Sequence, residues 1–186
     1  MVDAHADSRT RILDAAEAIV QARGVPALTL ESAARDAGIS KGGLLYHYAS
    51  KEALLAAMLG RLAEVMEADF AATLAAQPEG RGRAARALLA SALKEPVAAC
   101  VLQDRAAAVF LAAFHHDPAL LDPVRAVFAR MRAAIAADGL PPGVGQAIMC
   151  ATDGLFMVHV FGLYTLTPAE LADLRAALER LLETGR

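Results

Sequence analysis

Apolar residues recur at intervals of three and four positions along most of the chain, which is the spacing of one face of an α-helix. The first such pattern predicts a helix over residues 8–23 that ends at Gly24, and Pro26 enforces the break. Residues 1–7 form a polar arm that we expect to be disordered. Strand-like runs of valine, isoleucine and threonine are missing, so the sequence predicts an all-α protein.

Residues 29–55, TLESAARDAGISKGGLLYHYASKEALL, predict two short helices joined by a tight turn and followed by a third. Thr29 is a suitable N-cap for the first helix. Gly38 ends it, because glycine adopts the left-handed conformation at no steric cost. Ser40 is the N-cap of the second helix, which we expect over Lys41–Tyr48. This arrangement is a helix-turn-helix, which lays its second helix in the major groove of DNA.

The same stretch resembles the DNA-binding signature of the tetracycline-repressor (TetR) family of bacterial transcription regulators. The resemblance covers roughly residues 9–56 and includes the AGIS turn, the YHY end of the second helix and the SKE restart. Two positions depart from the pattern: Gly43 stands where many relatives have threonine, and Ala49 where many have proline. The first reduces the side-chain surface for base contacts, and the second loosens a corner.

The second short helix has a composition that suits a close approach to DNA. Gly42 and Gly43 each cost about 0.5–1 kcal/mol relative to alanine in a helix, and close contact with a sugar-phosphate backbone would justify them. Ser40 can offer its hydroxyl or N–H group to a phosphate, and Lys41 can neutralise a phosphate or reach a guanine edge. With those that the resemblance implies, the predicted DNA-binding residues are Thr29, Ser40, Lys41, Gly42, Gly43, Leu44, Tyr46, His47 and Lys51.

Several of these positions have a plain structural alternative. Leu44 or Leu45 has to anchor the short helix, and we assign Leu45 and Tyr48 mainly to that core. For His47 and Lys51 the alternative to a phosphate contact is a solvated surface position. The same two alternatives apply to Arg9 and Arg11 at the start of the first helix.

Charge and length then limit how the chain could bind DNA. Its 186 residues have room for a small module and a larger one. The net charge is −3, and residues 1–60 hold six lysines and arginines against seven aspartates and glutamates. DNA binding must therefore depend on where the cations lie rather than on their number.

The rest of the chain predicts a larger helical body. A helix over residues 51–76 and a Pro/Gly linker at 78–82 precede further helices, expected over 83–93, 96–115, 122–137, 144–164 and 169–183. We expect a three-helix DNA-binding domain at 1–50 and an effector-binding and dimerisation domain at 51–186. The last two helices are apolar on more than one face, which implies a partner. The resemblance implies a homodimer through these two helices.

Asp153 is an acid within an apolar helix, and a buried carboxylate needs a partner or stays protonated. It either binds a polar or cationic group of an effector or caps a neighbouring helix or the dimer partner. The residues that could line a cavity are Phe110, Phe114, Phe128, Met131, Met149, Asp153, Phe156 and His159, with a filled core as the alternative for each.

Other site chemistry finds little support. The HHD sequence at residues 115–117 is a poor metal site, because adjacent histidines on a helix point about 100° apart. No nucleophile–base spacing, phosphate loop or carboxylate pair is present, so we expect neither an enzyme nor a cofactor. Cys100 and Cys150 are expected to be buried in a reducing cytoplasm. No signal peptide or apolar stretch of about 20 residues is found, and we expect a cytoplasmic protein without membrane contact.

These patterns together predict a homodimeric, sequence-specific transcriptional regulator. We expect a repressor that a small apolar or amphipathic effector releases from a palindromic operator, with half-sites roughly 34–36 Å apart. One alternative is an all-α dimeric interaction protein with a non-specific or vestigial DNA-binding head and no effector. A small helical enzyme is the other, disfavoured by the missing catalytic spacing.

Overall fold

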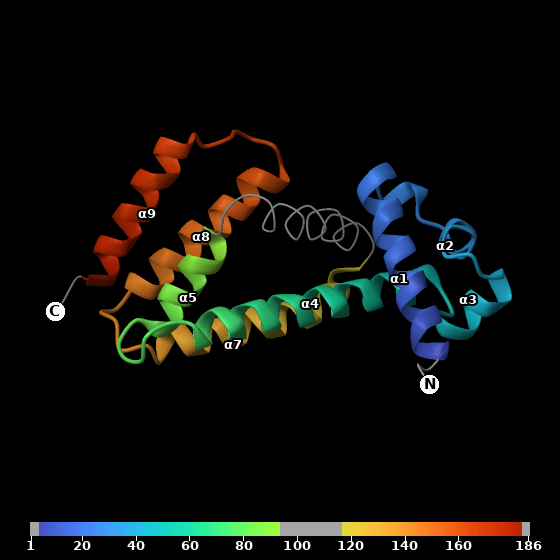
Figure 1. The fold of residues 1–186 in the computed structure, drawn as a ribbon, viewed down its shortest axis with the longest axis horizontal. Helices are drawn as coiled ribbons and strands as arrows, with labels where there is room; N and C mark the ends of the chain where they lie inside the picture. Colours follow the sequence, from blue (N-terminus) through green and yellow to red (C-terminus); the bar gives the residue numbers. More distant parts are fainter. Residues whose placement is uncertain (1–3, 94–116, 184–186) are drawn as a thin grey trace. The chain divides into compact units, whose positions relative to one another are not determined.

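The structure, a computed structural model, describes residues 4–93 and 117–183 (Figure 1). Within these ranges the elements are α1 (Ala4–Arg23), η1 (Val25–Ala27), α2 (Leu30–Asp36), α3 (Lys41–His47), α4 (Lys51–Ala75), α5 (Arg83–Ala92), η2 (Pro118–Leu121), α7 (Asp122–Ala136), α8 (Val144–Val160) and α9 (Pro168–Glu183). The described residues contain no strand, and the all-α prediction is confirmed. None of their helices is both long and apolar enough to cross a lipid bilayer.

Two helix ends differ from the prediction. Helix α1 begins at Ala4, so the residues just before position 8 are helical rather than disordered, and Asp7 lies in the first turn, where a carboxylate suits the helix dipole. Helix α8 ends at Val160 instead of residue 164, because Gly162 takes a left-handed φ of 57° and turns the chain. The helix expected over 96–115 lies outside the described residues.

The chain divides into two compact units. The described part of the first comprises residues 4–64 and 117–125, and that of the second comprises 65–93 and 126–183. Helices α4 and α7 each contribute residues to both units.

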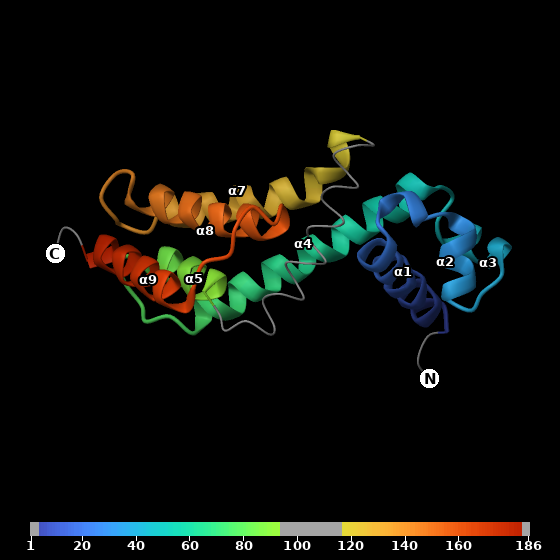
Figure 2. The same ribbon diagram turned by 90° about the horizontal axis from the view of Figure 1, so that it is seen from above.

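In the first unit, α2 packs between α1 and α3, as Figure 2 shows. Burial drives this packing, since each fully buried leucine or isoleucine contributes about 1.5–3 kcal/mol. The side chains with no or almost no exposed surface are Ile12, Ala16, Ile19, Val20, Leu28, Ala33, Leu44, Leu54, Leu55, Met58 and Leu59.

The second unit has its own core where α5, α8 and α9 meet. Its buried residues are Ala85, Leu89, Ile148 and Leu178. Helix α8 also comes very close to α7 at Gly145, where an added Cβ would stand only 2.3 Å from Cγ2 of Ile135. Only glycine is therefore accommodated at this crossing.

Helix α5 borrows its N-terminal cap from the connection after α7. The residue before α5 is Gly82, which has no side chain to cap with and a φ of 78°. The carboxylate of Asp138 accepts hydrogen bonds from the backbone N–H groups of Ala84 and Ala85, both at 2.9 Å, and its backbone oxygen accepts one from Gly82 at 2.8 Å. One aspartate thus satisfies three N–H groups that a helix start leaves unpaired.

Polar contacts tie the later part of α4 into the same unit. Glu67 of α4 forms an ion pair with Arg130 of α7, with 2.8 Å between Oε1 and Nε. The hydroxyl of Ser91 on α5 donates a hydrogen bond to the carboxylate of Asp69. Helix α4 is therefore attached to both α5 and α7 within this unit.

Candidate nucleic-acid interface

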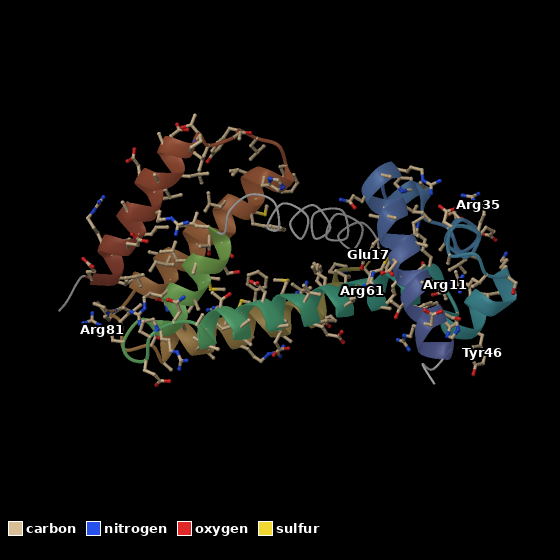
Figure 3. All side chains as sticks on the ribbon, viewed as in Figure 1. Arg11, Glu17, Arg35, Tyr46, Arg61 and Arg81 are labelled. Atoms are coloured by element: carbon tan, nitrogen blue, oxygen red, sulfur yellow. The ribbon has the colours of Figure 1, made fainter. Side chains whose placement is uncertain are left out.

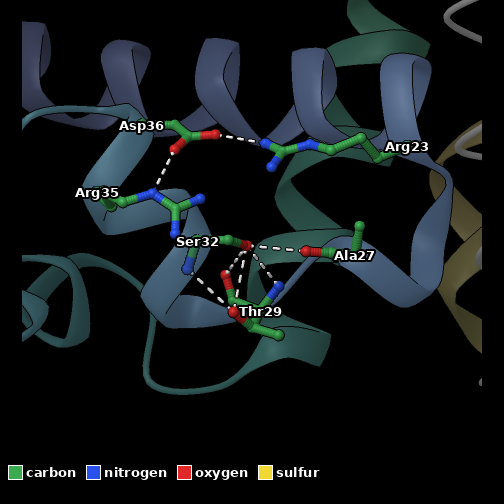
Figure 4. Close-up of polar contacts among 6 residues, drawn as sticks. All are labelled: Arg23, Ala27, Thr29, Ser32, Arg35 and Asp36. Carbon is green, nitrogen blue, oxygen red and sulfur yellow. Dashed lines mark hydrogen bonds and ion pairs between the residues drawn. The ribbon is translucent and has the colours of Figure 1, made fainter.

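The start of α2 is held by a reciprocal pair of caps (Figure 4). The Thr29 hydroxyl accepts a hydrogen bond from the Ser32 N–H at 3.0 Å, and the Ser32 hydroxyl accepts one from the Thr29 N–H at 2.9 Å. Ser32 also donates to the Ala27 carbonyl at 3.0 Å, which fixes the connector before the helix. The predicted N-cap at Thr29 is confirmed.

The turn between α2 and α3 closes with two hydrogen bonds and a left-handed glycine. The N–H of Ile39 donates to the carbonyl of Ala34, the N–H of Gly38 donates to that of Arg35, and Gly38 has a φ of 67°. This pattern is a Schellman motif, which satisfies the last carbonyls of a helix. It fixes the direction in which α3 leaves.

Arg11 of α1 secures the same turn from outside. Its Nη2 donates to the carbonyls of Ala37 at 2.5 Å and Gly38 at 3.5 Å. A Cβ on Gly38 would stand 3.2 Å from that nitrogen. Glycine therefore suits this position for both its conformation and its small size, and Arg11 supports the turn.

Helix α3 buries a different leucine from the one predicted. Ser40 caps it by accepting from the N–H of Gly43 at 3.0 Å, as expected. Leu44 is fully buried, whereas Leu45 is 41% exposed. The assignment of Leu45 to the core is therefore wrong, and the side chain of Leu44 has no surface to offer DNA. Leu44 and the buried Tyr48 are four residues apart and share one helix face, while Leu45 lies about 100° away.

The other candidates within α3 lie on its exposed or half-buried surface. Lys41, Gly42 and Tyr46 are exposed, and Gly43 and His47 are half-buried. Tyr46 is 76% exposed and projects from the helix (Figure 3). Its ring meets that of His47 edge-on, with 5.2 Å between centroids. A large aromatic side chain this exposed, with a hydroxyl at its tip, is suited to an outside contact.

The glycines of α3 are not both required by packing. A Cβ on Gly42 would meet only the Ser40 hydroxyl, at 4.0 Å, which is ordinary contact, whereas one on Gly43 would lie 3.3 Å from the same oxygen. Gly42 in particular has no packing reason within the unit. Its exposed position leaves the backbone of the first turn open to a close approach.

The cations near α3 are paired with carboxylates of α2. Lys41 forms an ion pair with Glu31, and Asp36 accepts from Arg35 at 2.9 Å and from Arg23 at 2.5 Å (Figure 4). Lys41 holds the pKa of Glu31 below its usual range, and Arg35, followed by Arg23, does the same for Asp36. Because these pairs are exposed, each contributes little to stability. No local spacing points to the pair of Glu31 with Lys41, because the two residues are ten positions apart.

The other cations of the head also have partners. Lys51 donates to the Val25 carbonyl at 3.2 Å, and its ammonium keeps two further donors. The guanidinium of Arg9 lies 5.4 Å from the centre of the Tyr48 ring, a cation–π distance. Both residues therefore help to hold the head together.

Arg61 of α4 lies beside Glu17 of α1 (Figure 3) and joins the two helices through two carboxylates. Its Nε donates to Glu17 at 2.9 Å and its Nη1 to Asp14 at 2.6 Å. Burial by itself lowers the pKa of Arg61, but the hydrogen bonds to Glu17 and Asp14 outweigh burial and raise it. This half-buried network fixes the first part of α4 against α1.

The candidate effector residues that the structure describes lie on α7 and α8 of the second unit. Phe110 and Phe114 lie outside the described residues. Met131 and Met149 are buried, His159 is exposed, and those that are half-buried are Phe128, Asp153 and Phe156.

Asp153 shares one face of α8 with Met149 and Phe156, because the three lie at i, i+4 and i+7. Burial raises the pKa of Asp153, and the described residues offer its carboxylate no hydrogen-bond or ion-pair partner. Cys150, expected to be buried, is exposed on another face of α8.

Comparison with known proteins settles the relationship of the chain. The family described as "Bacterial regulatory proteins, tetR family" matches residues 12–58, and "Tetracyclin repressor-like, C-terminal domain" matches residues 82–183. The chain belongs to the TetR family. It is therefore a TetR-family transcriptional regulator, as the resemblance implied.

Among individual proteins, one relative matches only part of this TetR-family chain. The uncharacterised HTH-type transcriptional regulator TtgW of Pseudomonas putida is 39% identical over 64 residues, 34% of this chain and 48% of that protein. The match thus spans about half of that relative's length.

Two solved structures resemble almost the whole chain. A TetR-family member from Streptomyces coelicolor A3, SCO1917, is 29% identical, with a TM-score of 0.65 over 94% of this chain and 97% of the other. The multidrug binding protein EbrR, solved with malachite green, is 28% identical, with a TM-score of 0.67 over 93% and 96%.

The two adjacent leucines of α3 provide a matched test of the head. Leu44→Ala should lower the free energy of unfolding by about 2–5 kcal/mol, because it empties a fully buried site. Leu45→Ala should change it by no more than about 0.5 kcal/mol, since Leu45 is exposed. Urea unfolding followed by circular dichroism measures both values. Equal losses for the two variants would show that α3 is rotated relative to the orientation described.

Proposed function

We propose that this TetR-family regulator represses transcription by placing α3 of each protomer in the major groove of a palindromic operator, and that a small molecule releases it. The observation that carries the proposal is the solvent-exposed surface of α3, which presents Lys41, the open glycine at position 42 and Tyr46, with the half-buried His47 against the Tyr46 ring. Thr29 and Ser40 are exposed near the helix starts, and Lys51 retains donors for a phosphate. The DNA-binding head is taken as residues 1–50 and the helical body as 51–186.

A homodimer is part of the proposal, because α3 has only seven residues and reaches few base pairs by itself. We place the dimer contact on α8 and α9. Support comes from large apolar side chains left exposed in the single chain, which are Met157, Phe161, Leu163, Tyr164, Leu171 and Leu181. We also propose that the regulator works in the cytoplasm and has neither a catalytic role nor a cofactor.

The effector is proposed to be an apolar or amphipathic molecule that carries a positive charge. Asp153 is a half-buried acid without a partner among the described residues, beside Met149 and Phe156 on α8. EbrR was solved with malachite green and with ethidium, both of which are aromatic organic cations. A carboxylate within apolar surroundings is the chemistry that binds such ions. Phe128 and Met131 of α7 are the other described residues assigned to this site.

Release needs only a modest coupling between the effector and DNA sites. An effector that favours one conformation by 1–3 kcal/mol changes operator affinity by about 5–150-fold. Helix α4 is the element proposed to carry this coupling, since it is continuous from Lys51 to Ala75 and contributes to both units.

The head is tested by removing Lys41 and Tyr46 separately. Lys41→Ala should weaken binding to a DNA fragment selected by the wild type and should reduce the salt slope by about one charge per head. Tyr46→Ala should weaken binding with little change of slope, because tyrosine is uncharged. Fluorescence anisotropy between about 50 and 200 mM salt measures both effects.

Arg132→Ala is the matched control, because it removes an exposed cation from α7 in the second unit. All three variants should remain dimers by light scattering. If Lys41→Ala and Tyr46→Ala both bind the fragment as the wild type does, α3 is not the groove-binding helix.

Asp153→Asn separates a binding role from a structural one. Burial raises the folded-state pKa of Asp153, so ionisation of this carboxyl lowers the stability of the folded protein. Stability is therefore greatest below the unfolded pKa of about 4 and falls as pH rises through the folded pKa. Asn removes this loss, so the variant should melt at a higher temperature than wild type at pH 7, with the difference fading towards pH 4. It should also bind ethidium about tenfold or more weakly, through loss of a charged contact.

Asp173→Asn, at an exposed position on α9, should change neither property. A lower melting temperature for Asp153→Asn at pH 7 would assign the carboxylate a structural partner instead. A wild-type protein that binds neither ethidium nor malachite green would contradict the cationic effector.

A further inference from the structure

Every lysine and arginine within residues 4–64, the described N-terminal part of the first unit, has a partner in that same stretch. The contacts are Arg9 with the Tyr48 ring, Arg11 with the Ala37 and Gly38 carbonyls, Arg23 and Arg35 with Asp36, Lys41 with Glu31, Lys51 with the Val25 carbonyl, and Arg61 with Asp14 and Glu17. Carboxylates therefore offset the charge of Arg23, Arg35, Lys41 and Arg61, whereas the ring and carbonyl partners of Arg9 and Lys51 hold those side chains without neutralising them.

The pair of Lys41 with Glu31 stands out because Lys41 is the first residue of α3. Its side chain is 57% exposed and that of Glu31 is 63% exposed, so both charges face solvent. Lys41 keeps the pKa of Glu31 low, and the carboxylate is therefore ionised at neutral pH, where DNA binding is measured. Together the two side chains present no net charge at the start of the candidate recognition helix.

We propose that Glu31 sets the strength of DNA binding by neutralising the lysine at the start of the recognition helix. The inference rests on the proposed function of α3. A phosphate that reaches Lys41 has to displace the Glu31 carboxylate or accept it as a close negative neighbour. Either way, the pair contributes less attraction than a lone lysine, and recognition relies more on the uncharged contacts of α3.

Lys41 is the main partner of Glu31 but not the only one. Glu31 lies in the first turn of α2, where an acid suits the helix dipole, and after Lys41 its own backbone N–H and the Thr29 side chain also lower its pKa. The N-terminus of α2 is in addition capped by Thr29 and Ser32. An exposed ion pair also contributes little to folding stability. Folding therefore depends little on the pair, whereas its negative charge lies directly beside Lys41. Restrained affinity suits a regulator whose effector changes binding by only about 5–150-fold.

The test compares four proteins: wild type, Glu31→Gln, Lys41→Gln and the double variant. Each is titrated by fluorescence anisotropy with a fragment selected by the wild type and with a duplex of unrelated sequence, across a range of salt. Glu31→Gln should bind both duplexes about 1.5- to 5-fold more tightly per head, which is the strength of an exposed pair. Its salt slope should steepen by about 0.9 per head.

The other variants complete the charge balance. Lys41→Gln should bind more weakly, with a shallower slope, because it leaves the Glu31 carboxylate beside the phosphates. The double variant should return close to the wild-type affinity and slope. A merely structural role for Glu31 would instead weaken Glu31→Gln and leave the double variant weaker still.

Glu64→Gln is the matched control, since it makes the same change of net charge at an exposed site on α4 with no link to Lys41. If it steepens the slope as much as Glu31→Gln, the effect is one of overall charge and the proposal is overturned. If the wild type selects a fragment but Glu31→Gln binds no more tightly, the inference fails and the function stands. If no fragment is selected but the order of the four proteins holds on the unrelated duplex, Glu31 keeps its role and the operator proposal fails.

Discussion

The turn between α2 and α3 is the constraint on which the rest of the head depends. A helix of seven residues is not stable by itself, because nucleation costs more than so few hydrogen bonds return. Helix α3 exists because Ser40 caps it, Leu44 anchors it and the motif at Gly38 sets its direction. Arg11 holds the same turn from α1. The candidate DNA-binding face is thus positioned by contacts on its opposite side.

Charge is the second constraint, and it limits the attraction between the head and DNA. The same cations that hold the head together, Arg11 at the turn and Arg61 between α4 and α1, are occupied by that work. The candidate DNA-binding surface of α3 therefore offers backbone, hydroxyl and aromatic groups beside a lysine that is paired with Glu31. A dimer doubles these contacts and so raises the affinity for DNA, while each contact stays weak enough for a small effector to reverse binding.

Much of the fold could be predicted because its signals are local. Helical spacing, the cap at Thr29 and the stop at Gly38 each act within a few residues, and these predictions were confirmed. The choice between Leu44 and Leu45 could not be made, because neighbouring identical side chains differ only in how α3 is turned against α2. The Asp138 cap of α5 joins residues 54 positions apart, and no local pattern reveals it.

The central claim is that α3 reads a specific, two-fold operator, and selection of bound fragments from a pool of random DNA at about 0.1 M salt tests it most directly. A dimer that reads such an operator should enrich an inverted repeat whose half-sites lie about one helical turn apart, roughly 34–36 Å. Enrichment of no sequence, with weak binding to every fragment, would contradict it. The chain would then be a helical TetR-family protein whose head has a different task.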